Sequence, residues 1–497
     1  MKKRGIISFI LIAVVLVVGW IFIRRGKDTE GSVYVGHLEE ADRTLSPNER
    51  YQKDLEFLYK EIKNYYVNLE YKEETFNYKW DQLYQKYKDE LGDASTEREF
   101  YKVASQFVSQ LMDGHTALKY SSQTRGKIFD SEDYMKTVFQ LRMIENKPIV
   151  VKNMKGLDIL GYELVSINDI PMNQIINTMA RYYATHNNEE SIRSKIVYRN
   201  IFYNYFDFFP GNYTTYSSYP LLDVKLRNSG GEEKVIKIKN AKYRRRPYQL
   251  KEEINFGLTD QNSLPTYKVL EDNIGYIKIP TFALKKNDLV NTFDDIVTKL
   301  KEKKVKGVVI DLRYNGGGNS SYREILSYLT DEKINITPYR FKDTKRFDQQ
   351  LPWRVMMENI RSKSLDKEAE EGYTKWWTWD VKPSKEDYLR KIPVAVLSNE
   401  VIFSSTGGFI NTCLNFDLAT VVGNSVPLSG FGLSKAVLLP SKNYHIIYPL
   451  HESRDPDFSQ IENVVKQPDI QVEQTLADFE KGIDSQLEAA VNYLNNK

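Results

Sequence analysis

The sequence predicts an α/β fold: a helical region comes first, a strand-rich region follows, and a mixed core of parallel strands and helices ends the chain. Apolar residues recur at three- and four-residue spacing across residues 47–125, which is typical of core-facing helices. Short apolar runs separated by turn residues dominate residues 126–265. Over residues 266–497 strand and helix patterns alternate, and strand–helix–strand order implies a parallel crossover.

The chain opens with a segment typical of a membrane anchor. Residues 6–23 carry no charge, and basic residues flank them on both sides. These 18 residues are just long enough to cross the hydrocarbon core of a bilayer. A cleavable signal peptide would show a shorter apolar stretch and small residues before its cleavage site, and neither is evident. We therefore expect an uncleaved transmembrane anchor over residues 1–25, followed by a polar linker over residues 26–46.

Residues 47–125 predict an N-terminal helical domain. The last of its helices begins with a capping pattern at Thr96, and its apolar stripe ends just before the segment Asp-Gly-His-Thr at residues 113–116. We expect these stripes to form a core and the domain to present His115 at the end of its last helix.

Residues 126–265 predict a β-rich domain. A turn at Gly161, a strand, a turn at Asn168 and Asp169, and then a helix resemble the second half of a PDZ domain. No segment matches the carboxylate-binding loop of such domains well. A scaffold domain is therefore at least as good an interpretation as a peptide-binding one.

The core over residues 266–497 contains an apparent insertion at residues 331–391, which is rich in charged and aromatic side chains. Trp376, Trp377 and Trp379 fall within it, and they either cover a cleft or pack locally; we favour packing. Helical patterns near the end of the chain close the core.

Composition restricts the function. At 497 residues the chain can hold roughly three domains. The 70 basic residues nearly balance the 67 acidic ones, the net charge is +3, and no basic stripe is evident, so nothing favours nucleic-acid binding. The single cysteine, Cys413, excludes an intramolecular disulfide and a cysteine-built zinc site, and its apolar neighbours indicate a small core residue. We expect no cofactor and no metal, and the oligomeric state stays open.

The most distinctive segment is a strand at residues 307–312 that runs into three consecutive glycines, Gly316 to Gly318. The apolar run predicts a buried strand, and Asp311 with Arg313 predicts an ion pair at its end. Glycines are favoured where the chain takes a positive φ or approaches a ligand closely. Backbone N–H groups exposed at such a turn can stabilise a developing negative charge.

A second apolar strand at residues 394–397 leads to Ser404, at the start of a predicted helix. Serine at this position has two interpretations. It can cap the helix by accepting a hydrogen bond from a free N–H group. It can also be a nucleophile, with the N–H of the next residue serving as half of an oxyanion hole. Spacing alone favours the cap.

Together, the segments GVVIDLRYNGGG and VAVLSNEVIFSSTGGF resemble the C-terminal processing, or tail-specific, serine peptidases, which share a core with tricorn protease. The resemblance covers roughly residues 50–120 and 266–495. It implies a crotonase-like β–α spiral as the peptidase core. It also implies Ser404 as the nucleophile, with Ser405 and Gly317 as the oxyanion-hole donors. Gly407 stands where the family has an acidic residue.

The resemblance also implies the general base. One branch of the family uses a lysine soon after the nucleophile, but Ser429 occupies that position and Lys435 comes six residues too late. The other branch uses a histidine in an Asp-Gly-His-Thr segment, which implies His115. Glu462, six residues before a Pro-Asp-Ile motif, is then implied as the group that orients this histidine, although a solvated surface glutamate is an equally good interpretation. Gly114 stands where tricorn-like members have a serine.

These expectations describe a membrane-anchored serine peptidase that acts outside the cytoplasm on peptide or protein substrates. The alternative is a catalytically inactive peptide- or lipid-binding protein on the same fold, as retinoid-binding relatives of the family exemplify. Gly407 and the missing lysine favour the alternative, whereas the presence of both Ser404 and His115 favours catalysis.

Overall fold

The computed structural model describes residues 45–128, 139–153, 157–183, 185–198, 221–239, 263–342, 363–365, 369–429 and 434–497. The predicted anchor over residues 1–25 and nearly all of the predicted linker lie outside these ranges. Within them, no helix is both long enough and apolar enough to cross a membrane.

The N-terminal region is helical, as predicted. Its helices are α2 (Pro47–Tyr65), α3 (Leu69–Thr75), α4 (Trp80–Leu91), α5 (Glu97–Ser109) and the short α6 (Ser122–Ile128). The predicted cap at Thr96 is confirmed, because its side chain accepts from the N–H of Glu99 while the Glu99 carboxylate accepts from the N–H of Thr96.

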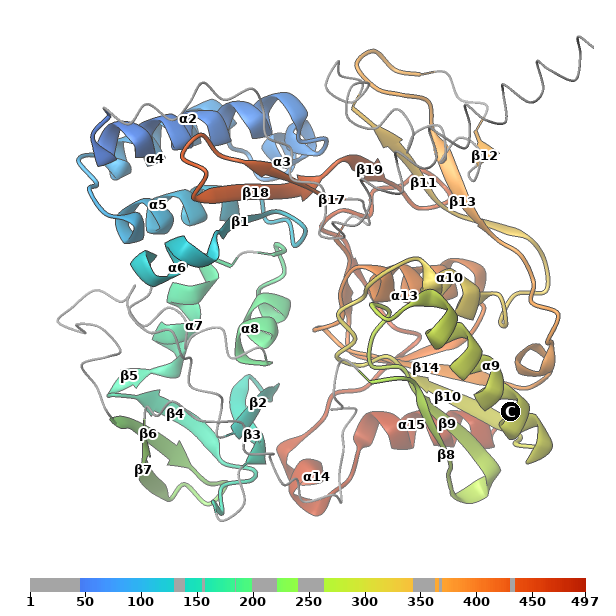
Figure 1. Cartoon of the computed structure of the whole chain (residues 1–497). Helices are drawn as coiled ribbons and strands as arrows, with labels where there is room; N and C mark the ends of the chain where they lie inside the picture. The colour runs from blue at the N-terminus through green and yellow to red at the C-terminus, as the bar shows by residue number, and fades with distance from the viewer. Residues whose placement is uncertain are drawn as a thin grey trace, which may run out of the picture.

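A hairpin from the far end of the chain completes this helical domain. β17 (Ser434–Leu438) and β18 (Tyr444–Pro449) form an antiparallel sheet with β1 (Ala117–Tyr120), in the order β1-β18-β17. Figure 1 shows the red hairpin lying against the blue helices. Tyr444 and Ile446 are buried in the same apolar cluster as α2, α4 and α5, so the helical domain is not built from residues 47–125 alone.

The middle region is β-rich and antiparallel, with the strand order β2-β3-β4-β6-β7 and β5 paired to β4. Its elements are β2 (Phe139–Ile144), β3 (Lys147–Asn153), β4 (Glu163–Ile167), β5 (Ile170–Pro171), α7 (Met172–Ala180), α8 (Glu189–Tyr198), β6 (Leu221–Arg227) and β7 (Glu233–Lys239). Both helices pack their apolar residues into one cluster with the sheet.

The core sheet has the order β21-β15-β14-β10-β9-β8 and is parallel except where β8 pairs with β9. Its strands are β8 (Thr266–Val269), β9 (Ile274–Lys278), β10 (Gly307–Asp311), β14 (Val394–Ser398), β15 (Thr420–Gly423) and β21 (Ile470–Gln471). The predicted parallel crossover is confirmed, because β9 and β10 are parallel and α9 (Lys286–Glu302) connects them.

Helices cover both faces of this sheet (Figure 1). Along β10, Val308 and Ile310 face the cluster formed with α9, α10 (Ser321–Leu326) and α13 (Ser405–Phe416). Val309, on the opposite face, packs against α15 (Ser485–Asn495). This alternation explains the continuous apolar run, since a strand buried on both faces has no polar side. Cys413 is fully buried in the same cluster as Val308, as predicted.

The described part of the apparent insertion pairs with β19, a strand from later in the chain, in a separate antiparallel sheet with the order β12-β13-β11-β19. Its strands are β11 (Ile334–Phe341), β12 (Lys363–Ser364), β13 (Trp377–Val381) and β19 (His451–Ser453). Trp379 stacks on Tyr339 with ring centroids 4.4 Å apart, so the aromatic cluster packs within this sheet. The described residues also form the short helix α14 (Leu476–Lys481) and the strand pair of β16 (Val426–Pro427) with β20 (Val465–Lys466). Two short 3-10 helices are η4 (Glu271–Asn273) and η5 (Tyr388–Lys391).

Candidate active site

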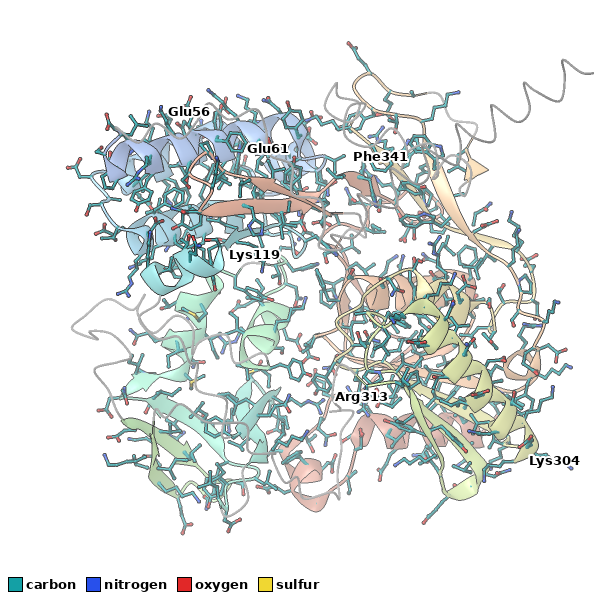
Figure 2. The ribbon with its side chains drawn as sticks, in the orientation of Figure 1. Glu56, Glu61, Lys119, Lys304, Arg313 and Phe341 are labelled. Carbon is teal, nitrogen blue, oxygen red and sulfur yellow. The ribbon has the colours of Figure 1, made fainter. Side chains whose placement is uncertain are left out.

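A buried ion network fixes the carboxyl end of β10. The predicted ion pair is confirmed, with Nη2 of Arg313 at 2.8 Å from Oδ2 of Asp311 and both side chains fully buried. Arg313, labelled in Figure 2, also reaches Asp484 at the start of α15, with Nη1 2.7 Å from Oδ1. Lys278 on β9 donates to Oδ1 of Asp311 at 3.2 Å and to the carbonyl of Arg313 at 2.7 Å. Each charge in this network is matched, which a buried position requires.

The pKa values follow from burial and from these neighbours. Burial lowers the pKa of Lys278 to about 8, although Asp311 opposes the shift. Burial alone would raise the pKa of Asp311, but Arg313 and Lys278 outweigh it and hold this pKa below its ordinary value. The carboxylate therefore stays ionised, and the strand end from which the glycine turn starts is held firmly.

The glycine turn presses directly against the segment that carries the candidate nucleophile. Gly317 has a φ of 90°, and a Cβ placed there would lie 2.5 Å from the Phe403 carbonyl oxygen and 2.8 Å from Cβ of Ser404. No side chain fits at these distances. Glycine at 317 is thus required both by the positive φ and by the approach of Ser404.

Ser404 takes a strained backbone conformation immediately before α13, with φ 55° and ψ −125°. Its side chain does not cap the helix. Oγ instead lies 3.0 Å from Nε2 of His115, and the serine is only partly buried. Of the two sequence-based interpretations, the geometry matches that of a nucleophile beside a base.

His115 is held by the turn that follows α5. Oδ1 of Asp113 accepts the backbone N–H of His115 at 2.7 Å, which closes a side-chain turn. Oδ2 of the same carboxylate accepts from the hydroxyls of Tyr66 at 2.7 Å and Thr116 at 2.9 Å. Immediately after this turn, β1 joins β18, with Ala117 opposite Ile447. Side chains and a strand ladder together fix the loop that presents the imidazole.

Phe403 packs between the two halves of the site. Its ring stacks on the His115 ring with centroids 4.5 Å apart. A Cβ at Gly114 would lie 2.3 Å from Cε2 of this phenylalanine, so no larger residue fits there. Glycine at position 114 thus leaves the space that the Phe403 ring occupies.

The electrostatic surroundings keep His115 neutral near pH 7. Burial lowers its pKa below the ordinary histidine value; Asp113 opposes this shift and Lys195 adds to it. Lys195 lies on α8 with Nζ 5.2 Å from the centre of the Phe403 ring. A neutral imidazole with Nε2 at the serine hydroxyl is the form that accepts a proton.

The structure does not place Glu462 against the histidine. Its Oε1 lies 2.5 Å from Nζ of Lys72, and both side chains are buried. Nδ1 of His115 has no hydrogen-bond partner among the described residues. The expected direct contact is therefore absent here, because the buried lysine requires the carboxylate.

Glu462 nevertheless lies close to the loop that carries the histidine. Lys72 hydrogen-bonds to Oδ1 of Asn463, and Nδ2 of Asn463 donates to the carbonyl of Met112 at 3.0 Å. Lys72 itself lies 3.4 Å from that carbonyl. The pair thus supports the backbone that immediately precedes Asp113.

The two expected oxyanion-hole donors differ in whether their N–H groups already have an acceptor. The N–H of Ser405, in the first turn of α13, has no acceptor within the described part of the chain. The N–H of Gly317 already donates to Oδ1 of Asn315 at 2.9 Å. Gly317 can serve an oxyanion only if that bond opens, whereas Ser405 is available as it stands.

A second histidine, His186, is not available as a base. His186 is buried, with Nε2 2.9 Å from the carbonyl oxygen of Leu428 and Nδ1 accepting the N–H of Asn188, and burial lowers its pKa to about 3. Both ring nitrogens are used, so this histidine is structural. Three residues of the site were not predicted: Asp113, Lys195 and Phe403. Asp113, two residues before His115, and Phe403, directly before Ser404, had a signal in their sequence position, whereas Lys195 had none.

Comparisons with known proteins give one family match and several structures of similar fold. Residues 273–472 match the model of peptidase family S41. The structure of mature CPAF complexed with lactacystin is similar with a TM-score of 0.66 at 17% identity, covering 90% of this chain and 99% of that one. Mature CPAF gives 0.64 at 16% identity, covering 90% and 96%. Tricorn protease gives 0.43 at 14% identity, covering 90% of this chain and 36% of that one. A search of curated proteins found no significant match.

Proposed function

The chain carries a domain of peptidase family S41 and is a serine peptidase of this kind, and from that premise we propose that Ser404 and His115 hydrolyse peptide bonds. The single observation that carries the proposal is the 3.0 Å separation between Oγ of Ser404 and Nε2 of His115. These atoms come from segments 289 residues apart, and a structural role for the serine, as helix cap, is absent.

The reaction is acyl transfer from the leaving amine to water. Oγ of Ser404 attacks the scissile carbonyl carbon while Nε2 of His115 takes the hydroxyl proton. The tetrahedral oxyanion accepts the N–H of Ser405. As the C–N bond breaks, the imidazolium returns the proton to the leaving amine. Water, deprotonated by the same nitrogen, then hydrolyses the acyl-enzyme and restores Ser404.

The imidazolium formed in the first step is stabilised by charge rather than by a direct bond to Nδ1. The Asp113 carboxylate favours the protonated ring, whereas burial and Lys195 disfavour it. Asp113 thus performs at a distance part of the task that an orienting carboxylate performs in other serine hydrolases.

Hydrolysis of a denatured protein substrate tests the assignment. We expect the purified chain to cleave it and the Ser404→Ala protein to retain no measurable activity. The matched control is Ser405→Ala, which keeps its backbone N–H and loses only a hydroxyl that donates to the carbonyl of Gly318. Cleavage by Ser404→Ala at the wild-type rate would refute the proposal.

We also propose the finer architecture implied by the resemblance: a crotonase-like β–α spiral for the core and a PDZ-like arrangement for the middle domain. The parallel order of the core strands supports the first, and the helix α7 after a β4–β5 turn supports the second. Superposition of an experimentally determined structure on representatives of both folds tests each.

Residues 1–25 are proposed as a single-pass anchor in the cell membrane, with the peptidase domain outside the cytoplasm. The support is the uncharged stretch over residues 6–23 with basic flanks. Alkaline extraction should leave the chain in the membrane fraction, and external protease should degrade its catalytic domain in intact cells. Release by alkaline extraction would contradict the anchor.

A further inference from the structure

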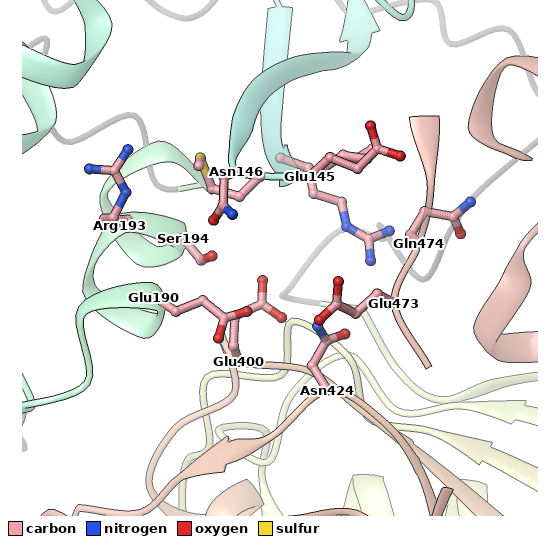
Figure 3. A pocket seen from close by; sticks show the side chains of 12 residues that line it. Glu145, Asn146, Glu190, Arg193, Ser194, Glu400, Asn424, Glu473 and Gln474 are labelled. Atoms are coloured by element: carbon pink, nitrogen blue, oxygen red, sulfur yellow. The ribbon is translucent and has the colours of Figure 1, made fainter. Parts of the chain in front are cut away.

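A pocket of about 210 Å³ lies where the β-rich domain meets the core (Figure 3). The turn between β2 and β3 and one side of α8 form its walls, together with core loops that carry Glu400 and Glu473. Neither Ser404 nor His115 lines it. The pocket is therefore distinct from the catalytic pair, and its charged lining has no role in the mechanism above.

One lining residue, Arg142, is a buried cation with free hydrogen-bond donors. It is only 4% exposed, yet Nε and Nη1 are buried without a hydrogen-bond partner among the described residues. Its guanidinium lies over the Tyr314 ring, 5.7 Å from the ring centre. Buried N–H groups of a charged side chain are costly to leave unpaired. These donors are suited to a carbonyl or carboxylate oxygen of a bound molecule.

A second lining residue, Glu400, is a buried anion with a free acceptor. It is 6% exposed, and its Oε2 is buried without a hydrogen-bond partner in the described part of the chain. A buried carboxylate requires a cation or several donors. The pocket therefore presents an unsatisfied positive group and an unsatisfied negative group from two different domains.

The rim adds negative charge. In Figure 3 the carboxylates of Glu190, Glu400 and Glu473 extend toward the same space, whereas Arg193 points away from them. Arg193 donates to the side chains of Asn173 and Asn177 instead. Burial raises the pKa of Glu190, and the charges of Glu400 and Glu473 raise it further. A cation between these carboxylates would relieve their repulsion.

The pocket is within reach of a peptide bound at the nucleophile. Glu400 precedes Ser404 by four residues, so their α-carbons are at most about 14 Å apart. An extended peptide advances about 3.3 Å per residue, and a long basic side chain extends its reach further. The Tyr314 ring beneath Arg142 also lies just before the glycine turn.

We propose that this pocket recognises a lysine or arginine residue of the substrate within about five residues of the scissile bond. The side-chain cation would bind among Glu400, Glu190 and Glu473, and a backbone carbonyl beside it would accept from Arg142. The assignment of this ligand as substrate rests on the proposed peptidase function; the binding itself does not.

Binding is measured on the full chain carrying Ser404→Ala, so that cleavage plays no part. The probe is a fluorescent heptapeptide, acetylated and amidated, with one central arginine among glycines; its partner has norleucine in place of arginine. By fluorescence anisotropy, the arginine peptide should bind at least about tenfold more tightly. Glu400→Gln should remove most of this difference, and Arg142→Met should weaken both peptides.

Two further variants separate binding from folding. Glu473→Gln alters an exposed side chain and should weaken the arginine peptide without changing the melting temperature. The control Glu232→Gln alters an exposed turn of the same β-rich domain and should change nothing. Equal binding of the two peptides, or an unchanged affinity in both Glu400→Gln and Glu473→Gln, would overturn the proposal.

Competition distinguishes a peptide ligand from a free amino acid. N-acetyl-arginine amide, which keeps carbonyls on both sides, should displace the peptide at lower concentration than free L-arginine or spermidine does. Stronger displacement by free L-arginine would overturn the assignment to substrate. Failure of the peptidase proposal would appear instead as absent hydrolysis by the wild-type chain, with binding intact.

Discussion

Ser404 and His115 meet at one hydrogen bond, but they are held there by different kinds of interaction. Ser404 lies between a parallel strand and a helix, and its position is set by backbone: a strained φ and the close approach of Gly317. His115 lies on a loop whose position is set by side chains, including Asp113 and the buried Lys72–Glu462 pair. The nucleophile is therefore sensitive to changes of local shape, and the base to the loss of distant contacts.

The largest expected effect comes from removing the candidate base. His115→Ala removes the only side chain bonded to Oγ of Ser404 within the described residues and should lower kcat about 10⁴-fold or more. The control His445→Ala removes a half-buried histidine of β18 and should leave kcat within a few-fold of wild type. A comparable loss in both variants would show that hydrolysis depends on folding alone.

Gly317→Ala tests the claim that backbone shape holds the nucleophile. The added Cβ would press on Phe403 and Ser404, so kcat should fall about 10²-fold or more. Gly372→Ala is the matched control, because Gly372 also has a positive φ, 81°, but nothing lies within 4 Å of the added Cβ. Both variants should lose about 1–2 kcal/mol of unfolding free energy from the left-handed backbone. Gly317→Ala should lose more because of its clash, and only this variant should lose activity.

Lys72→Met tests the claim that side chains hold the base. It removes the cation that pairs with the buried Glu462 carboxylate and should destabilise the chain by about 3–5 kcal/mol. Movement of the His115 loop should lower kcat about 10-fold with little change in KM. The double variant Lys72→Met/Glu462→Gln should recover part of the stability. A double variant no more stable than the single one would argue against a direct coupling between the two side chains.

The smallest expected effect is a shift of the pH profile in Lys195→Met. The lysine charge disfavours the imidazolium, so its removal should raise the pKa of His115. Because the base acts in its neutral form, kcat/KM would then fall at a higher pH as the solution is acidified. Lys234→Met, which removes a cation stacked on Tyr162 in the β-rich domain, should leave the profile unchanged. An acid limb that moves to lower pH would contradict the sign.

The sequence predicted those parts of the site that lie in continuous segments. The strand before the glycine turn and the Asp311–Arg313 pair carry local patterns, whereas Ser404 and His115 were implied by the family resemblance. No sequence pattern predicted how Glu462 is oriented, because its partner Lys72 is 390 residues away. A glutamate that pairs with a lysine cannot be told from one that orients a histidine by the residues around it.

Long-range pairing limited the fold prediction in the same way. β17 and β18 were assigned to the core by their place in the chain, yet they belong with β1, because an edge strand with an apolar face can pair with any complementary edge. The sequence also could not predict the pocket at Arg142 and Glu400, because this pocket forms only where two domains meet. The sequence pattern predicted individual helices and strands, but it did not predict which distant elements pack against one another.

The most direct test of the central claim is covalent labelling by a fluorophosphonate probe, followed by peptide mass spectrometry. We expect a single adduct on Ser404, full labelling in Ser405→Ala, and slow labelling in His115→Ala, because the base that activates the hydroxyl is gone. An unlabelled Ser404 in the folded wild-type chain, or labelling at the same rate in His115→Ala, would contradict the central claim.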